Sequence, residues 1–171
     1  YGDSKPTRVD LSALENNQLV ALQTHRNEWH SRTARRLLQE RHAAGKDMSL
    51  AHQSLRKLFG TSSDTPHRLR EMWALYATGG LDGRALIEPL GDKNEYVRAW
   101  AVRLLVDRAA PAGSVIARFG EMAKDDPSPL VRLYLASALQ KVHTDDRWAI
   151  AEGLVSHSED ASDASLPLMI W

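Results

Sequence analysis

Histidine is the residue type best suited to bind a metal or move a proton near neutral pH, and the chain holds seven histidines. They are His25, His30, His42, His52, His67, His143 and His157. No two are four residues apart, so none forms the pair that places two imidazoles on one helix face. We predict no metal site and expect the histidines at the surface or at helix caps. His30 also has a half-buried alternative, because it aligns with Val97 in a repeat described below.

Other side chains that could do chemistry lack the surroundings that catalysis needs. There is no Gly-x-Ser-x-Gly turn and no phosphate-binding glycine loop, and "TGGLDG" is typical of a helix end followed by a cap at Asp82. The absence of cysteine excludes thiolate nucleophiles, cysteine zinc sites, disulfides and covalent haem attachment within these residues. Aspartates flank expected helix starts, where they favour capping over acid–base catalysis; they are Asp125, Asp126, Asp145 and Asp146. We predict no catalytic or cofactor-binding residue, so this domain is not expected to be an enzyme.

Arginines gather on one expected helix beside Trp29, and we take Arg32, Arg35 and Arg36 as a candidate binding surface. Arg26 and Arg41 extend the same sector. Nucleic-acid phosphates bind to sectors of this kind. However, the whole chain is neutral, with 22 Lys/Arg and 22 Asp/Glu, and the later helices do not continue the sector. We therefore favour a solvated face, or a docking surface for an acidic neighbouring domain, over nucleic-acid binding.

A second charged pattern combines aspartate and arginine at a fixed spacing. Asp92 precedes Arg98 by six residues, and Asp126 precedes Arg132 by six. This spacing places a carboxylate in a turn and a guanidinium in the first turns of the following helix. We expect charge-assisted hydrogen bonds between structural units at these residues.

The elements that must position these residues are predicted from internal repeats. "NEWHSRTARRLLQER" from Asn27 resembles "NEYVRAWAVRLLVDR" from Asn94, 67 residues later. "DPSPLVRLYLASALQKV" from Asp126 matches the latter with an offset of 34. Because 67 is about twice 34, a further copy is expected between the first two, and "TPHRLREMWALYATGG" from Thr65 lies there.

Each copy predicts one amphipathic helix with apolar residues at i, i+3, i+4, i+7 and i+8. The stripes are Leu69, Met72, Trp73, Tyr76, Ala77; Val97, Trp100, Ala101, Leu104, Leu105; and Val131, Tyr134, Leu135, Ala138, Leu139. Shorter apolar segments precede them at 11–23, 50–59, 84–90 and 115–123, and another lies at 145–155. We expect Trp29, Trp73, Trp100 and Tyr134 to pack between units, in preference to forming a sugar-binding platform.

Capping residues and glycines predict the helix boundaries. Expected N-caps are Asp10, Asn27, Ser49, Thr65, Asn94, Ser128 and Thr144. Gly45, Gly60 and Gly79–Gly80 are expected to end helices. Strand patterns are nearly absent. The predicted fold is all-α, a right-handed α-α superhelix of HEAT-like or armadillo type with about five two-helix repeats in one domain. Its approximate units are 10–44, 49–79, 82–109, 112–142 and a truncated 144–171, with each apolar face buried by the next unit.

The pattern DxxxxVRxxA, from Asp92 to Ala101, resembles the HEAT repeat, whose typical unit has Asp in the turn and Val-Arg opening its second helix. "DPSPLVRLYLA" is similar and includes a turn proline. A period of 34 residues also suits tetratricopeptide repeats, but their Trp-Leu-Gly-Tyr spacing is absent. The HEAT repeat is the better match.

Most of the chain from residue 18 onward also resembles the HEAT-repeat region of large planctomycete and verrucomicrobial proteins. These are described as membrane-bound dehydrogenases with a haem-binding Cys-x-x-Cys-His domain. The resemblance is carried by "NEWHSRTARRLLQER", "LREMWALYATGGLD", "VRAWAVRLLVD", "SPLVRLYLASALQKV", "RWAIAEGLVSHSED" and "LPLMIW". It implies a scaffold or protein-interaction module in an exported, periplasmic protein, with haem c bound by another domain and no cofactor here.

The ends and the hydropathy of the chain complete these expectations. The sequence starts without Met and stops in the apolar run "SLPLMIW", so we expect a fragment of a longer chain. No run approaches the roughly 18 apolar residues that a membrane span needs, so membrane insertion by this segment is not expected. The expected partners are neighbouring domains or other proteins. The alternative is a stand-alone binding module that uses its concave face for a protein or, less favourably, for nucleic acid, as helical-repeat DNA glycosylases do.

Overall fold

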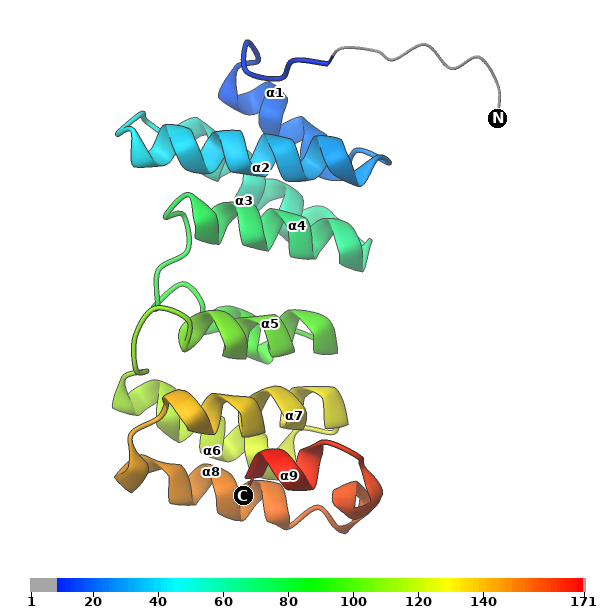
Figure 1. Ribbon diagram of the computed structural model, residues 1–171, viewed down its shortest axis with the longest axis vertical. Helices are drawn as coiled ribbons and strands as arrows, with labels where there is room; N and C mark the ends of the chain where they lie inside the picture. The colour runs from blue at the N-terminus through cyan, green and yellow to red at the C-terminus, as the bar shows by residue number, and fades with distance from the viewer. Residues whose placement is uncertain (1–8, 171) are drawn as a thin grey trace. The chain divides into compact units, whose positions relative to one another are not determined.

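The computed structural model describes residues 9–170, and every regular element in that range is helical, with no β-strand (Figure 1). The prediction of an all-α fold is confirmed. The chain divides into two compact units, one ending at Gly80 and the other beginning at Leu81. Each unit is built from antiparallel helix pairs, and each is described on its own. Among the described helices, none has the combination of length and apolar character that crossing a bilayer demands.

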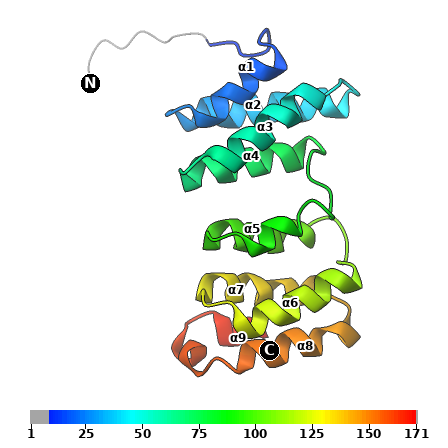
Figure 2. The same cartoon turned by 180° about the vertical axis from the view of Figure 1, so that it is seen from behind.

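Within residues 9–80, the described part of unit 1, there are four α-helices. They are α1 (Asn16–Ala21), α2 (Glu28–Ala43), α3 (Ser49–Thr61) and α4 (Thr65–Ala77), with a 3-10 turn at Leu22–Thr24 between α1 and α2. Helix α1 packs against α2 and α3, α3 packs against α4, and α2 packs against α4. The long α2 and α4 lie in one row, which the view from behind also shows (Figure 2). Helices α1 and α2 fall within residues 10–44, and α3 and α4 fall within residues 49–79.

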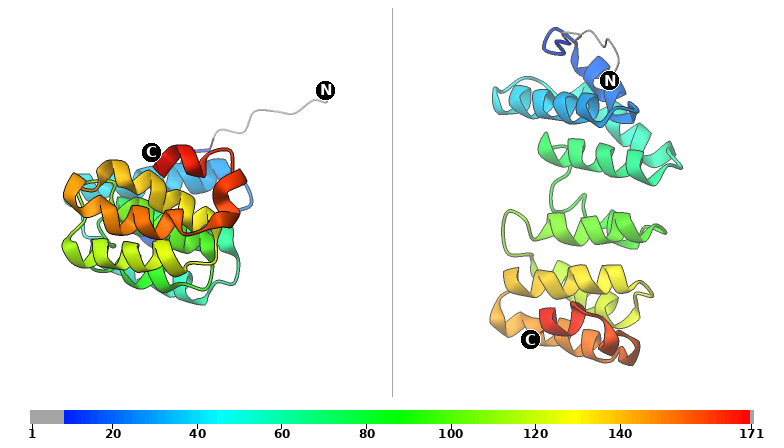
Figure 3. Two further views of the ribbon diagram at one scale, coloured as in Figure 1. Left: turned by 90° about the horizontal axis from the view of Figure 1, so that it is seen from below. Right: turned by 45° about the vertical axis from the view of Figure 1, so that its right-hand side comes forward.

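Residues 81–170, the described part of unit 2, form five α-helices and several 3-10 turns. The α-helices are α5 (Glu95–Leu105), α6 (Gly113–Asp125), α7 (Pro129–Ala138), α8 (Arg147–Val155) and α9 (Leu166–Ile170). The 3-10 segments are η2 (Glu88–Gly91), η3 (Leu139–Lys141), η4 (Thr144–Asp146) and η5 (Ser158–Ser162). One row is formed by α5, α7 and α9, and a second by α6 and α8 (Figure 3).

One predicted helix is replaced by turns. The segment 84–90 was expected to be helical, but it forms turns that end in η2. Its apolar residues still serve the core, because Leu86 and Leu90 are each only 1% exposed. Pro89 explains why no α-helix forms, since a proline ring inside a helix removes a backbone hydrogen bond and clashes with the preceding turn.

Helix starts follow the predicted capping chemistry at three of the repeat copies. The Asn27 side chain accepts a hydrogen bond from Trp29 N, the Asn94 side chain from Tyr96 N and Val97 N, and Ser128 from Val131 N. Each bond satisfies an amide that has no partner within the helix. The same residues therefore set the register of α2, α5 and α7.

Some predicted boundaries are wrong by one residue or more. Asp64, and not Thr65, caps α4 by accepting a hydrogen bond from His67 N at 2.8 Å. The N-cap of α3 is Met48, and Asp47 beside it accepts from Ser49 N at 2.9 Å. Gly60 lies inside α3, whereas Gly45 and Gly79 adopt a φ of +75° at helix ends.

The core of each unit consists mainly of leucine and alanine, and most of the large rings lie at its edge. Trp29 was expected to pack between units, but it is 47% exposed, while Trp73, Trp100 and Tyr134 are half-buried. Closely packed helices leave room for smaller side chains at the centre of each contact, so the rings are displaced toward the margin of the helix row. The fully buried positions include Leu38, Leu55, Met72, Leu75, Phe119, Leu135, Ile150 and Leu154.

Candidate functional site: an arginine–aspartate ladder and its neighbouring surfaces

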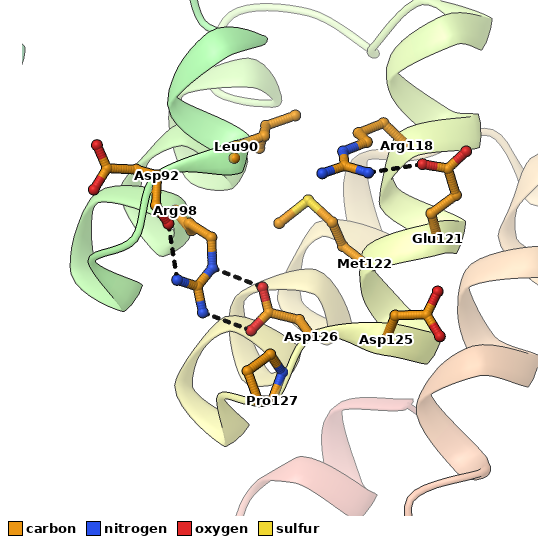
Figure 4. Close-up of a pocket in the computed structure, with 10 residues that line it drawn as sticks. Leu90, Asp92, Arg98, Arg118, Glu121, Met122, Asp125, Asp126 and Pro127 are labelled. Carbon is orange, nitrogen blue, oxygen red and sulfur yellow. Dashed lines mark hydrogen bonds and ion pairs between the residues drawn. The ribbon is translucent and has the colours of Figure 1, made fainter.

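Arg98 connects two successive helix pairs of unit 2. Its Nε and Nη2 donate to the two carboxylate oxygens of Asp126 at 2.7 and 2.8 Å, and its Nη1 donates to the Asp92 carbonyl at 2.9 Å (Figure 4). Asp92 precedes α5, and Asp126 lies in the turn between α6 and α7. The bidentate geometry matches the planar fork of a guanidinium to a carboxylate, which gives both strength and orientation.

The same arrangement recurs one repeat later. Arg132 donates from Nε and Nη2 to the carboxylate of Asp160 at 2.5 and 2.6 Å, and from Nη1 to the Asp126 carbonyl at 2.9 Å. Asp126 therefore serves one arginine through its side chain and the next through its backbone. The result is a continuous chain of hydrogen bonds, which we call the ladder, formed by Asp92, Arg98, Asp126, Arg132 and Asp160.

Sequence reasoning selected four of these residues but missed Asp160 and the actual pairing. Each arginine bonds the carboxylate 28 residues after it, and it uses only the backbone carbonyl of the aspartate six residues before it. The missing residue had a clear signal, because Asp160 follows Asp126 by the same 34 residues that separate Asp126 from Asp92.

Burial makes these ion pairs different from ordinary surface pairs. The side chains of Arg98 and Asp126 are 12% and 5% exposed, and those of Arg132 and Asp160 are 3% and 9% exposed. Hydrogen bonding to the carboxylate raises the pKa of Arg98 and of Arg132 above the usual arginine value, against the opposing effect of burial. Both guanidinium groups are therefore held in the charged form.

A pocket of about 360 Å³, lined by both charged and apolar residues, lies beside the Arg98–Asp126 pair, which we call the first rung of the ladder. In Figure 4, Met122 and Leu90 point toward its centre, and Arg118 pairs with Glu121 on the α6 side at 2.8 Å. The Arg98–Asp126 pair forms its lower wall. Because both Asp126 oxygens face Arg98, this arrangement acts as a structural clamp between helix pairs.

In unit 1, the predicted arginine surface is divided among different partners. Arg32 pairs with Glu28 at 3.3 Å, and Arg36 pairs with Glu40 at 2.8 Å, each on the exposed side of α2. The Arg35 guanidinium instead lies 5.3 Å from the centre of the Trp73 ring on α4, and burial lowers its pKa. The three cations therefore do not form one continuous unneutralised stripe.

The other two arginines of the predicted sector have separate positions. Arg41 ties the end of α2 to the segment before α1, because it donates to Asn16 Oδ1 at 2.8 Å and to the Ser12 carbonyl at 2.9 Å. Arg26 is exposed in the turn before α2. Arg41 therefore has a structural role and does not belong to the proposed surface of Arg32, Arg35 and Arg36.

The histidines mostly join helix ends. His25 Nδ1 accepts from Asn27 N at 3.0 Å, and the His25 ring lies 4.1 Å from that of His30, which is half-buried. His52 Nε2 is 3.0 Å from the Thr78 carbonyl, and His157 Nε2 is 3.0 Å from the Ala123 carbonyl. Across residues 9–170, no three or more His, Asp or Glu side chains are grouped so that they could hold a metal ion.

Sequence reasoning also missed a buried carboxylate in α4. Glu71 has no exposed surface, and neither of its oxygens accepts a hydrogen bond from a described residue. Burial raises its pKa to about 7, although the charge of Arg68 acts in the opposite direction. The signal was its repeat position, seven residues after the N-cap, where α5 has Ala101 and α7 has Leu135.

A second cavity in unit 2, of about 570 Å³, runs along α5 and α7. We call it the α5–α7 groove. It is lined by Arg103, Val106, Asp107, Leu133, Tyr134, Ser137, Ala138, Gln140, Lys141, Ser165 and Met169. Its volume falls within the roughly 300–1,000 Å³ typical of ligand-binding pockets.

Comparison with known proteins identifies no relative: no protein-family model, no curated protein and no solved structure matches this chain.

Proposed function

We propose that this chain is a HEAT-type helical-repeat scaffold that acts as a protein-interaction module. The observation that carries the proposal is the ladder, in which an arginine of one helix pair clamps the aspartate of the next at a constant spacing. A clamp that repeats with the sequence period supports the right-handed solenoid of about five repeats predicted above, because solenoids are held together by contacts between neighbouring repeats.

The charged residues selected from the sequence favour a structural role over a catalytic role for this chain. Arg98, Asp126 and Arg132 bond one another, while Arg32 and Arg36 bond glutamates on their own helix. We therefore propose that the chain holds or presents other protein domains and that chemistry is performed elsewhere. Turnover of a substrate by the chain alone would contradict this.

Site-specific photo-crosslinking in the source organism tests the interaction module. A photoreactive residue at Ser137, on the α5–α7 groove, is expected to give discrete adducts with another protein or with another domain of the same protein. The matched control is Ala117, which is exposed on α6 in the other helix row of unit 2. Equal adduct formation at both positions, or none at either, would contradict the proposal.

The family resemblance supports a more specific version of the proposal. In this version the module lies in an exported protein that resembles haem-binding, dehydrogenase-like multidomain proteins, and haem c binds to another domain. The intact mass of the native protein and the reading frame on both sides of residues 1–171 test this. A Cys-x-x-Cys-His segment downstream is expected, and its absence would favour a stand-alone binding module that uses the concave face of the proposed solenoid.

A nucleic-acid ligand is the weaker form of the stand-alone alternative. Glu28 and Glu40 neutralise Arg32 and Arg36, and Arg35 is half-buried against Trp73. Titration with duplex DNA at increasing salt concentration tests it, because phosphate contacts weaken steeply with salt. Salt-sensitive binding that disappears in the variant Arg35→Glu/Arg36→Glu would favour the nucleic-acid function.

A further inference from the structure

The lining of the α5–α7 groove combines apolar and polar side chains. Val106, Leu133, Ala138 and Met169 supply apolar surface, whereas Tyr134, Ser137, Gln140 and Ser165 supply hydroxyl and amide groups. Ligand sites commonly have this composition, in which apolar area gives affinity and a few polar groups fix orientation. The α5–α7 groove is therefore suited to a ligand with both apolar and hydrogen-bonding groups.

Two cations face this groove without a carboxylate partner. Arg103 on α5 and Lys141 in η3 both line it, and neither makes an ion pair with any residue between 9 and 170. Other arginines of unit 2 do have such partners: Arg98 pairs with Asp126, and Arg132 pairs with Asp160. The two groove cations thus differ from the structural arginines of the ladder.

Arg103 is also held in position. Its guanidinium lies 5.0 Å from the centre of the Trp100 ring, one turn earlier on the same helix. A cation stacked on a ring still presents its N–H edge, which is the part that bonds a carboxylate bidentately. Arg103 is therefore oriented for an anionic group before any ligand arrives, which lowers the entropic cost of binding.

The charge of the surrounding unit makes this pair distinctive. Residues 81–171 contain ten Lys/Arg and fourteen Asp/Glu, so unit 2 is net acidic. A net acidic unit repels an extended polyanion, and Asp107 on the groove wall adds to this effect. A peptide that carries one or two carboxylates among apolar residues matches the groove better than a nucleic-acid backbone does.

We propose that the α5–α7 groove binds an acidic peptide segment of a partner protein, with aspartate or glutamate side chains on Arg103 and Lys141 and apolar side chains on Leu133 and Met169. The inference rests on the proposed interaction module and names its surface and the chemistry of its partner.

The test uses the whole chain and an array of short peptides that have constant apolar content and increasing numbers of aspartate and glutamate. Binding is expected to increase from peptides with no carboxylate to peptides with two, one for each groove cation, to gain nothing from further carboxylates, and to weaken at high salt. In the variant Arg103→Glu/Lys141→Glu, the acidic peptides that bind best are expected to lose affinity by about tenfold or more. Fluorescence anisotropy with the strongest of these peptides measures the change.

A matched variant controls for charge and folding. Arg118→Glu/Lys124→Glu reverses two cations on the exposed side of α6, away from the α5–α7 groove, and is expected to bind the same peptide as the unmodified chain does. Ser137→Trp is a second groove variant that keeps the charge, and it is expected to reduce binding by filling the groove. Circular dichroism verifies that all three variants fold.

Several outcomes would overturn the inference. These are binding that is independent of carboxylate number, an equal loss in the α6 variant, or no binding to any peptide in the array. Preference for duplex DNA that disappears in Arg103→Glu/Lys141→Glu would assign the groove to nucleic acid instead. If photo-crosslinking finds a partner whose capture is unaffected by the groove variants, the interaction module stands and only this groove assignment fails.

Discussion

At the scale of single residues, the ladder depends on arginines that are buried together with their aspartates. Arg132 is only 3% exposed, and its guanidinium bonds both oxygens of Asp160 and one backbone carbonyl. Such a group is costly to leave without its partner, because water cannot solvate a remaining buried charge. The rungs therefore matter more for stability than the exposed pairs Arg32–Glu28 and Arg36–Glu40 do.

The first prediction concerns this burial. Arg132→Met keeps an unbranched side chain about as long as arginine up to Nε but removes the charged guanidinium. It is expected to reduce the free energy of unfolding by about 3–5 kcal/mol, because Asp160 is then buried without its arginine partner. Urea denaturation measures the loss. Arg98→Met is expected to cost less, since Arg98 is 12% exposed.

The double variant Arg132→Met/Asp160→Leu is the control for this prediction. It removes both charges and is expected to recover most of the lost stability, as apolar replacements of buried ion pairs do. A loss of under about 1 kcal/mol for Arg132→Met, the range of exposed pairs, would contradict the assignment of the rung as a buried clamp.

Glu71 is a residue-scale exception, because its buried carboxylate accepts no hydrogen bond from residues 9–170 and its pKa is raised from 4.5 to about 7. The folded state therefore holds the proton more tightly than the unfolded state does. The contribution of Glu71 to the free energy of unfolding is therefore most favourable below pH 4.5. It declines as the pH rises toward about 7 and is constant above that value.

The second prediction follows from the upward shift of the Glu71 pKa. Glu71→Leu, which places in α4 the residue type that α7 has at Leu135, is expected to raise the free energy of unfolding above pH 7 by about 1–3 kcal/mol. The gain is expected to shrink as the pH falls toward 4.5. Urea denaturation across this pH range measures the difference between variant and original chain. A gain that stays the same at every pH would contradict a buried, titrating carboxylate.

At the scale of elements, α6 and α8 approach closely because small residues face each other. A Cβ on Gly153 would lie 2.9 Å from the backbone N of Lys124 and 2.9 Å from the Ala123 Cβ. At Gly120, by contrast, the nearest atom to a new Cβ is 3.6 Å away, which is ordinary contact. His157 strengthens the same contact through its 3.0 Å approach to the Ala123 carbonyl.

The third prediction compares these two glycines. Gly153→Ala is expected to destabilise the chain by about 1–3 kcal/mol, since the new methyl group forces the backbones of α6 and α8 apart. Gly120→Ala is expected to be neutral or to stabilise the chain by up to about 1 kcal/mol, because alanine is the better helix former. Thermal unfolding of both variants tests the comparison, and equal effects at the two positions would refute the close approach.

At the scale of the whole molecule, the chain consists of two units that each have their own core. Unit 1 buries residues such as Leu38, Leu55 and Leu75, and unit 2 buries residues such as Phe119 and Leu135. Because each unit has its own core, local damage is expected to remain within the unit where it occurs. The ladder described here belongs to unit 2.

The fourth prediction follows from this organisation. Asp160→Asn weakens the last rung, so hydrogen exchange is expected to increase in α7, α8 and α9, while amides of α2 and α4 in unit 1 keep their protection. Hydrogen-exchange mass spectrometry of the intact chain measures both regions in one experiment. A uniform increase across both units would show that the chain unfolds as one cooperative body.

The amino-acid sequence alone predicted the helical class, the position of most helices and the residues of the ladder except Asp160. It could do so because capping at Asn27, Asn94 and Ser128 and the spacing of apolar residues are local properties that recur with the repeat. The segment 84–90 was predicted to be helical from its apolar spacing but forms turns. The cause is also local, because Pro89 prevents an α-helix there.

Packing between helices sets which carboxylate each arginine bonds and where Trp29 and Arg35 lie. It also buries Glu71 and brings Arg103 and Lys141 to one groove. These features depend on the distance and rotation between neighbouring helix pairs, which arise from side-chain packing. If a helix is rotated by the angle of one residue, its side chains face different partners. The repeat period alone therefore cannot specify which residues pair.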